Sequence, residues 1–168
     1  MAGPVLEGDL MMGETYDARR EIPGWNCPGH DARGWLPAQL RPAPVARLVA
    51  PQQPPVRAVA VLRPVEEPVK LSEGPIKLTE GRYRFDLGQN FAGRVRLRGL
   101  RAPAGRTVRL RFAEMLRPDG ELYTENLRSA RATDTYTCGG DPAGEPPWEP
   151  RFTYHGFRYV ELSCLPPG

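Results

Sequence analysis

The segment YTENLRSARATD, residues 123–134, gathers side chains that can do chemistry, and it has no period that would bury an apolar face. It contains two carboxylates, Glu125 and Asp134, and a third acid, Glu114, ends the predicted strand before it. Hydrolysis of a glycosidic bond uses two carboxyl groups held about 5–10 Å apart across a sugar-sized cleft. Glu114, Glu125 and Asp134 are therefore the weak catalytic candidates, for the case of a compact hydrolase.

The competing interpretation is that these acids form ion pairs with arginines and hold a polar loop in place. Arg128 and Arg131 lie within the segment, and no histidine stands close to the acids in sequence to act as a general base. Ser72 and Ser129 also lack His and Asp partners at a spacing typical of a serine hydrolase. We favour ion pairing over catalysis and expect the isolated chain to be catalytically silent.

Sugar binding is a third interpretation, because an aromatic ring can stack on a sugar while Asn, Asp and Arg side chains bind its hydroxyl groups. The candidate platforms are Trp25, Trp35, Trp148, Tyr123 and Tyr154, although aromatic residues more often anchor a core or a loop. The candidates for ligand binding or docking are Tyr123, Glu125, Asn126, Arg128, Arg131, Trp25, Trp35 and His155.

Alternating apolar and polar residues predict several short strands joined by Gly/Pro turns. The predicted strands cover residues 82–87, 94–100, 107–114, 133–138 and 157–162. The last of these is apolar on both faces, which places it in the centre of a sheet. The pattern predicts an all-β fold, an antiparallel β-sandwich of jelly-roll or galactose-binding-like type.

The N-terminal part is expected to be less regular, because eight prolines lie between Pro37 and Pro68. We expect residues 1–50 to form an irregular Pro-rich arm packed on the sandwich. A short strand is expected after this arm, at residues 56–62. The main strands then lie within residues 51–165 of a single domain, residues 1–168. Elsewhere, only residues 125–132 could form a helical turn or two.

Composition limits the partners of the chain, whose net charge is only +3. The arginines of residues 94–112 alternate with apolar residues, as in a strand with one wet face, so no nucleic-acid partner is expected. No apolar run of about eighteen residues predicts a membrane span. No signal peptide is visible at the N-terminus, which favours a cytoplasmic location. The three cysteines and two histidines lack metal-ligand spacing, so no metal site is expected.

Five strings of the sequence, taken in order, resemble a known family: GETYDARREIPGW, PGHDARGW, FDLGQNFAGRVRLRG, PAGRTVRLRFAEMLRPDGELYTENLRSARATDTY and EPRFTYHGFRYVEL. They are similar to the non-catalytic β-sandwich region of bacterial α-L-rhamnosidases, glycoside hydrolase family 78. The resemblance runs from about Gly13 to Leu162. It implies that this region precedes an (α/α)6 barrel that carries the two acids of an inverting mechanism. Neither the barrel nor its acids map onto residues of this chain.

The resemblance makes the catalytic barrel of a parent enzyme the expected partner, and a rhamnose-containing glycan the expected ligand class. Some family members carry a calcium-dependent sugar-binding module, but no calcium ligands can be assigned here, so no cofactor is expected. Under this hypothesis residues 125–131 dock against the barrel or line the rim of its cleft. The alternatives are a stand-alone carbohydrate-binding module and the compact hydrolase described above.

Overall fold

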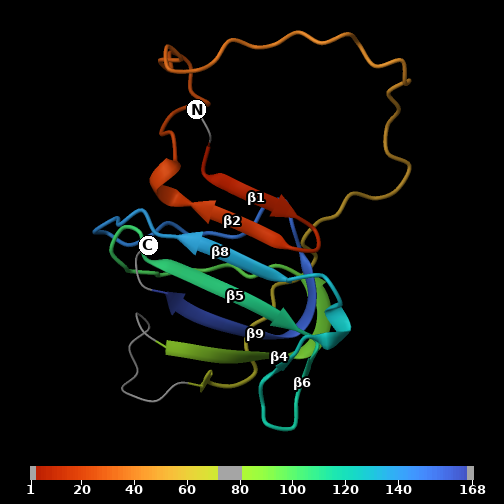
Figure 1. The fold of residues 1–168 in the computed structure, drawn as a ribbon, viewed down its shortest axis with the longest axis vertical. Coiled ribbons are helices and arrows are strands. Elements are labelled where there is room, and N and C mark those ends of the chain that lie inside the picture. The colour runs from red at the N-terminus through yellow and green to blue at the C-terminus, as the bar shows by residue number, and fades with distance from the viewer. Residues whose placement is uncertain (1–2, 72–80, 166–168) are drawn as a thin grey trace. The chain divides into compact units, whose positions relative to one another are not determined.

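The computed structural model of the protein describes residues 3–71 and 81–165. Ile22–Val61 form one compact unit, and Ala2–Glu21 together with Leu62–Gly168 form the other, which contains all the strands of the described residues (Figure 1). The elements in chain order are β1 (Val5–Asp9), β2 (Gly13–Asp17), the 3-10 helix η1 (Ala18–Arg20), β3 (Val69–Lys70), β4 (Gly81–Gly93), β5 (Thr107–Ala113), β6 (Met115–Leu116), β7 (Leu122–Tyr123), the 3-10 helix η2 (Glu125–Leu127), β8 (Thr133–Thr137) and β9 (His155–Leu165).

Seven strands form one twisted sheet in the order β1-β2-β8-β5-β9-β4-β3, and β6 and β7 form a separate two-stranded hairpin. Neighbouring strands of the large sheet are antiparallel except β2 and β8, which run parallel. β9 lies between β5 and β4, so its predicted central position is confirmed. The prediction of an all-β, sandwich-type fold is also confirmed.

The alternation in β5 explains why this strand lies deep in the sheet. Val108, Leu110 and Phe112 are each 1% exposed, whereas Arg109 and Arg111 point to the other face and stay half-exposed. Successive side chains of a strand point to opposite faces, so one face of β5 is apolar and the other is charged. The apolar face supplies the core, and the arginines keep the opposite face polar.

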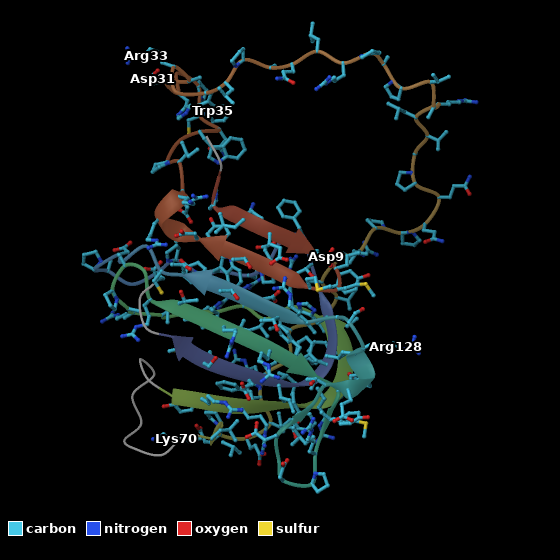
Figure 2. The ribbon with its side chains drawn as sticks, in the orientation of Figure 1. Asp9, Asp31, Arg33, Trp35, Lys70 and Arg128 are labelled. Carbon is cyan, nitrogen blue, oxygen red and sulfur yellow. The ribbon has the colours of Figure 1, made fainter. Side chains whose placement is uncertain are left out.

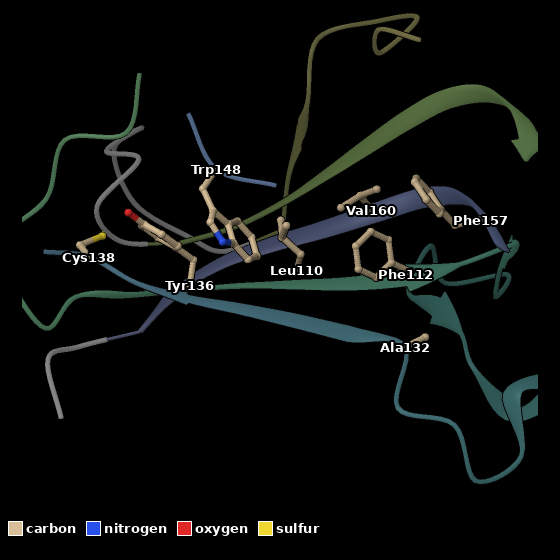
Figure 3. Packing of buried hydrophobic residues seen from close by; sticks show 8 residues of the cluster. All are labelled: Leu110, Phe112, Ala132, Tyr136, Cys138, Trp148, Phe157 and Val160. Atoms are coloured by element: carbon tan, nitrogen blue, oxygen red, sulfur yellow. The ribbon is translucent and has the colours of Figure 1, made fainter. Parts of the chain in front are cut away.

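The core gathers side chains from β5, β8 and β9 and from the segment after β8 (Figure 3). Its buried members are Leu110, Phe112, Ala132, Tyr136, Cys138, Trp148, Phe157 and Val160. The partly buried Val95, Leu97 and Leu100 pack against this cluster. Truncation of a buried Leu or Phe in such a core costs about 2–5 kcal/mol, so these contacts hold the sheet and its covering segments together.

The predicted strand at residues 94–100 is wrong, since within the described residues this segment forms a single bridge, Leu97–Trp148, and no ladder. The segment around its bridge partner Trp148 contains Pro146, Pro147 and Pro150, which have no backbone N–H to donate to a β-ladder. Instead β4 continues to Gly93, through the residues between the predicted strands 82–87 and 94–100. A register shift between Asp86 and Phe91 makes this continuation possible.

The prediction that residues 1–50 are irregular is wrong for residues 5–17, because β1 and β2 lie there and are strands of the large sheet. Gly13 lets β2 approach β8 closely. Its φ is +115°, and a Cβ at this position would lie 1.9 Å from the Thr133 carbonyl oxygen. Only glycine fits this close parallel approach. The short alternation in GETYD gives a weak local signal, and the contact with β8 decides the strand.

Residues 22–61 contain turns and extended backbone, and the structure describes no strand within them. The predicted strand at residues 56–62 is therefore wrong. Val56, Val59 and Val61 are at least 82% exposed, and the neighbouring Pro54 and Pro55 cannot donate to a ladder. Packing of the rest of the predicted arm on the sandwich stays a prediction.

One local prediction between β5 and β8 is supported by the structure. Before it, residues 117–120 form a turn in which the Gly120 amide donates to the Arg117 carbonyl oxygen at 2.9 Å. The expected helical turn is the single 3-10 turn η2. Both helices in the described part of the chain are three residues long, so neither could cross a bilayer.

Candidate functional site

Asp134, at the start of β8, is completely buried and has structural partners. Its Oδ1 accepts a hydrogen bond from the Glu14 amide at 2.9 Å and lies 3.0 Å from His155 Nε2. The His155 ring stacks on Phe112 with a centroid distance of 4.4 Å. A substrate cannot reach Asp134 in this structure, so the residue acts as a link between β2, β8 and β9.

Glu114 and Glu125 lie in the polar loop, defined here as residues 114–131 between β5 and β8. Glu114 accepts hydrogen bonds from the side-chain amides of Asn90, at 3.1 Å, and Asn126, at 3.0 Å. The side chain of Glu125 is 66% exposed and forms an ion pair with Arg117 at 2.8 Å. Each acid therefore has a partner that holds the loop in shape, as the ion-pairing interpretation expects.

Arg128 is the unusual residue of the polar loop. The Ala130 amide donates to the Leu127 carbonyl oxygen at 3.0 Å, and Arg128 between them has φ 56° and ψ −110°. These angles belong to the first central position of a type II′ turn, which glycine normally occupies. Arg128 is exposed, and Figure 2 shows it beside the turn that leads into β8. A non-glycine residue held at such angles is strained, and strain of this kind clusters at functional sites.

The structure separates the other candidates into two groups. Asn126 joins Glu114 in the polar loop, and Tyr123 lies in β7 of the hairpin within this loop, where it pairs with Met115. Arg131 pairs with Glu7 of β1. Trp25 and Trp35 belong to the other compact unit and are 60% and 45% exposed, while His155 is buried beside Asp134. The candidates thus fall into a surface group and a buried group.

A buried acid that the sequence did not single out lies in β2. Glu14 is 1% exposed, and its Oε2 accepts hydrogen bonds from the Arg151 and Phe152 amides at 2.9 and 3.0 Å. The Glu14 amide in turn donates to Asp134. No local pattern reveals this role, because the partners of Glu14 are 120 to 138 residues away in the chain.

A second buried acid, Glu145, closes the loop that follows β8. Its carboxylate accepts hydrogen bonds from the Tyr136 hydroxyl at 2.6 Å and from the Gly139 and Gly140 amides at 3.1 and 2.7 Å. Burial opposes the ionisation of Glu145, but these donors together outweigh it and hold the pKa of the carboxyl below its ordinary value. The Tyr136 pKa is raised by burial and by the neighbouring carboxylate.

The described residues bring together no three His, Cys, Asp or Glu side chains that could hold a metal ion. The three cysteines are free thiols, of which Cys138 is buried. Burial raises the pKa of the Cys138 thiol to about 11, so it remains protonated at neutral pH. Calcium binding has no support from the arrangement of these residues and stays untested.

Two family models match the chain. The model of the bacterial α-L-rhamnosidase concanavalin-like domain matches residues 76–168, and the model of the α-L-rhamnosidase N-terminal domain matches residues 1–60. The chain belongs to the bacterial α-L-rhamnosidase family. The boundary between the two models does not follow the fold of this family member. β1 and β2 lie within residues 1–60, but they belong to the same sheet as β4, β5, β8 and β9, which lie within residues 76–168.

Named relatives agree with this assignment. An α-L-rhamnosidase of Streptomyces avermitilis is 50% identical over an alignment of 168 positions that covers 98% of this chain and 15% of the relative. One from Formosa agariphila is 39% identical over 162 residues, 96% of this chain and 16% of the relative. The chain therefore spans about a sixth of the length of these curated relatives.

Solved structures give the same result. The structure of the α-L-rhamnosidase from Dictyoglumus thermophilum has a TM-score of 0.84 at 38% identity and covers 100% of this chain, which matches 18% of that structure. The structure of the Streptomyces avermitilis α-L-rhamnosidase complexed with L-rhamnose has a TM-score of 0.70 at 46% identity, covering 97% of this chain and 15% of that structure. The family resemblance seen in the sequence is confirmed. The chain corresponds to a small N-terminal part of these enzymes.

Proposed function

We propose that this chain supports the catalytic barrel of an α-L-rhamnosidase-like glycoside hydrolase and that its polar loop, residues 114–131, docks against that barrel. The observation that carries the proposal is Arg128, an exposed cation held at turn angles that glycine prefers. A strained residue persists only where the surrounding structure holds it, and such residues cluster at functional sites. Contact with a partner is a function that would account for the strain at Arg128.

The arrangement around Arg128 suits a docking role better than catalysis. Glu125 and Glu114 are engaged by Arg117 and by two asparagines, which gives the loop a defined shape. A defined loop loses little conformational freedom when it binds a partner. Asp134, the third catalytic candidate, is inaccessible. The acids of the loop thus provide rigidity, and Arg128 provides an exposed cationic group that a carboxylate or carbonyl oxygen of the barrel would bind.

The deciding experiment places Arg128→Gly in both the isolated chain and the full-length parent enzyme. Glycine adopts the angles of this turn position without steric strain, so the melting temperature of the isolated chain should stay the same or rise slightly. The full-length enzyme should lose stability or fall several-fold in kcat/KM on an aryl α-L-rhamnoside, because the docking cation is gone. Arg33→Ala, in the unit of residues 22–61, serves as the matched control.

Equal melting temperatures and equal kinetics of wild-type and Arg128→Gly full-length enzymes would overturn the docking role. A separate assay tests the accessory role itself. The purified 168-residue chain should hydrolyse no aryl α-L-rhamnoside above blank. Turnover that Glu114→Gln or Glu125→Gln abolishes would instead establish the compact hydrolase.

A further inference from the structure

The polar face of the large sheet carries a group of charged side chains from three neighbouring strands, β4, β9 and β5 (Figure 1). The strand register places two arginines of β4 and two of β5 opposite a serine and a glutamate of β9. Side chains alternate along a strand, so this group points away from the core that Leu110 and Val160 fill. We call it the arginine frame, and its members are Arg82, Arg84, Arg109, Arg111, Glu161 and Ser163.

The β4 half of the arginine frame, Arg82 and Arg84, is covered by the turn of the β6–β7 hairpin. Glu121 of this turn pairs with Arg82 at 2.6 Å, and the Gly120 carbonyl oxygen accepts a hydrogen bond from Arg84. Arg82 also pairs with the buried Glu161 at 2.6 Å. The turn thus presents a carboxylate and a backbone carbonyl, which are both acceptors that a guanidinium group can bind.

The β5 half of the frame, Arg109 and Arg111, has no such cover among the described residues. Arg111 meets Glu161 at 3.5 Å, and Arg109 has no ion pair with any residue that the structure describes. On the β8 side, the ladder partners of these arginines are Thr135 and Thr133, which carry no charge. This half of the frame therefore has two guanidinium groups and a single carboxylate, which Arg82 of the other half also binds.

Two buried polar atoms of the frame lack a hydrogen-bond partner within the described part of the chain. They are Nε of Arg109 and Oγ of Ser163, whose residues are direct neighbours across the β5–β9 ladder. Buried polar atoms are normally paired, so the hydrogen-bond network around Arg109 is incomplete. An approaching group would meet the ends of the guanidinium groups, since Arg109 is half-buried and the Arg111 side chain is 36% exposed.

The charge of the frame favours an anionic partner. Its four guanidinium groups meet two carboxylates, Glu121 and Glu161, so two positive charges remain without a counter-charge there. Arginine binds a planar carboxylate through two parallel N–H···O bonds. Both anions already at the frame are carboxylates of the polypeptide, and Glu121 comes from a covering turn. A second turn of the same chemistry would complete the β5 half.

We infer that the β5 half of the arginine frame binds an acidic turn of the parent enzyme, from the polypeptide outside this chain. This chain spans about a sixth of the length of its curated relatives, so the parent has ample polypeptide to supply such a turn. The inference rests on the proposed function in one respect, that this chain is one domain of a longer enzyme. It does not depend on Arg128, which lies outside the frame.

The test places Arg109→Gln in the isolated chain and in the full-length parent enzyme. Glutamine removes the charge, and Arg109 has no described ion pair to lose, so the isolated chain should keep its melting temperature. The melting temperature of the full-length enzyme should fall by about 2–4 °C, because the carboxylate of the docked turn loses its partner. Arg98→Gln is the matched control: Arg98 is exposed on the segment whose Val95 packs against the apolar core, and both melting temperatures should stay unchanged.

A binding assay on the isolated chain tests the chemistry of the frame. The probe is a fluorescein-labelled hexaglutamate peptide, followed by fluorescence anisotropy at low salt. Arg109→Gln and Arg111→Gln should each weaken binding at least about fivefold, whereas Arg98→Gln and Arg128→Gly should leave it unchanged. Tighter binding of an oligothymidylate, or equal displacement of the peptide by sulfate at the same ionic strength, would overturn the assignment of a carboxylate partner.

The melting experiment also separates this inference from the docking of the polar loop. If Arg109→Gln lowers the melting temperature of the isolated chain and of the full-length enzyme equally, Arg109 is a structural residue and the inference is wrong. Unchanged melting of both proteins would reject it as well. A loss in the full-length enzyme from Arg109→Gln but not from Arg128→Gly would support the arginine frame and reject the polar loop, and the opposite result would reject the frame.

Discussion

Two acidic regions of this molecule use the same residue types in opposite ways. In the polar loop, Glu125 is exposed and forms a solvated ion pair with Arg117. In the sheet, Glu14 and Asp134 are 1% and 0% exposed and are held by backbone amides and His155. An exposed ion pair contributes little to stability, whereas a buried carboxylate becomes costly as soon as a partner is lost. The buried acids therefore connect the fold, and the exposed acids shape a surface.

The largest expected effect comes from the buried region. Glu14→Ala would leave the Arg151 and Phe152 amides without their acceptor and open a cavity beside Asp134. We expect the free energy of unfolding to fall by about 3 kcal/mol. Urea denaturation of the variant and the wild type measures this loss. A change below about 1 kcal/mol would show that Glu14 does not connect β2 to the rest of the sheet.

A smaller effect is expected from the second buried acid. Tyr136→Phe removes the hydroxyl that donates to Glu145 and should lower the free energy of unfolding by about 1–2 kcal/mol. Thermal unfolding at neutral pH, followed by circular dichroism, is a suitable measurement. An unchanged melting temperature would mean that water replaces the hydroxyl without cost.

The pH dependence of stability follows from the same site. The folded pKa of Glu145 lies below its ordinary value of 4.5, because Tyr136 and the loop amides stabilise the carboxylate. Its contribution is therefore complete above that value and is lost as the pH falls through the lower folded pKa. The pKa of Asp86 is also lowered, mainly by the hydrogen bond from Arg158, so Asp86 likewise contributes stability that is lost at low pH. Unfolding free energies measured from pH 7 to pH 3 should stay level and then fall below about pH 4.5, with a shallower fall in Tyr136→Phe.

In the polar loop the effect on the isolated chain has the opposite sign. Arg128→Gly relieves the strain at a type II′ turn and should raise the free energy of unfolding by about 0.5–1 kcal/mol. Arg128→Ala keeps a Cβ at the same angles and should give no such gain. If both variants behave alike in denaturation, the turn angles are not a source of strain.

The smallest effect is expected from the exposed ion pair itself. Arg117→Ala should change the free energy of unfolding by no more than about 0.5 kcal/mol, because water screens the pair with Glu125. Denaturation at low and high salt checks this, since a weak surface pair should show little difference between the two. A loss as large as that of Glu14→Ala would remove the distinction between the two regions.

Local patterns predicted the strands that have strong alternation. Leu110 and Phe112 alternate with arginines, and the apolar run of β9 marks a strand covered on both sides, so both were found from sequence. The segment of Val95 and Leu97 has the same alternation and is not a strand. Its neighbour is rich in proline, and pairing needs a partner that can donate. Periodicity predicts which face of a segment is buried, but it does not supply the partner strand.

The sequence by itself determined the all-β class, the membership in the α-L-rhamnosidase family and the polar character of the loop around Arg128. These properties depend on residue types, on short spacings and on long ordered strings, all of which are present before the chain folds. Only the tertiary structure decided that β2 joins β8, that Glu14 and Asp134 are inaccessible and that Tyr16 packs against Trp148. The physical reason is that these contacts join residues more than a hundred positions apart, and no local preference specifies which distant backbone or ring a side chain will meet.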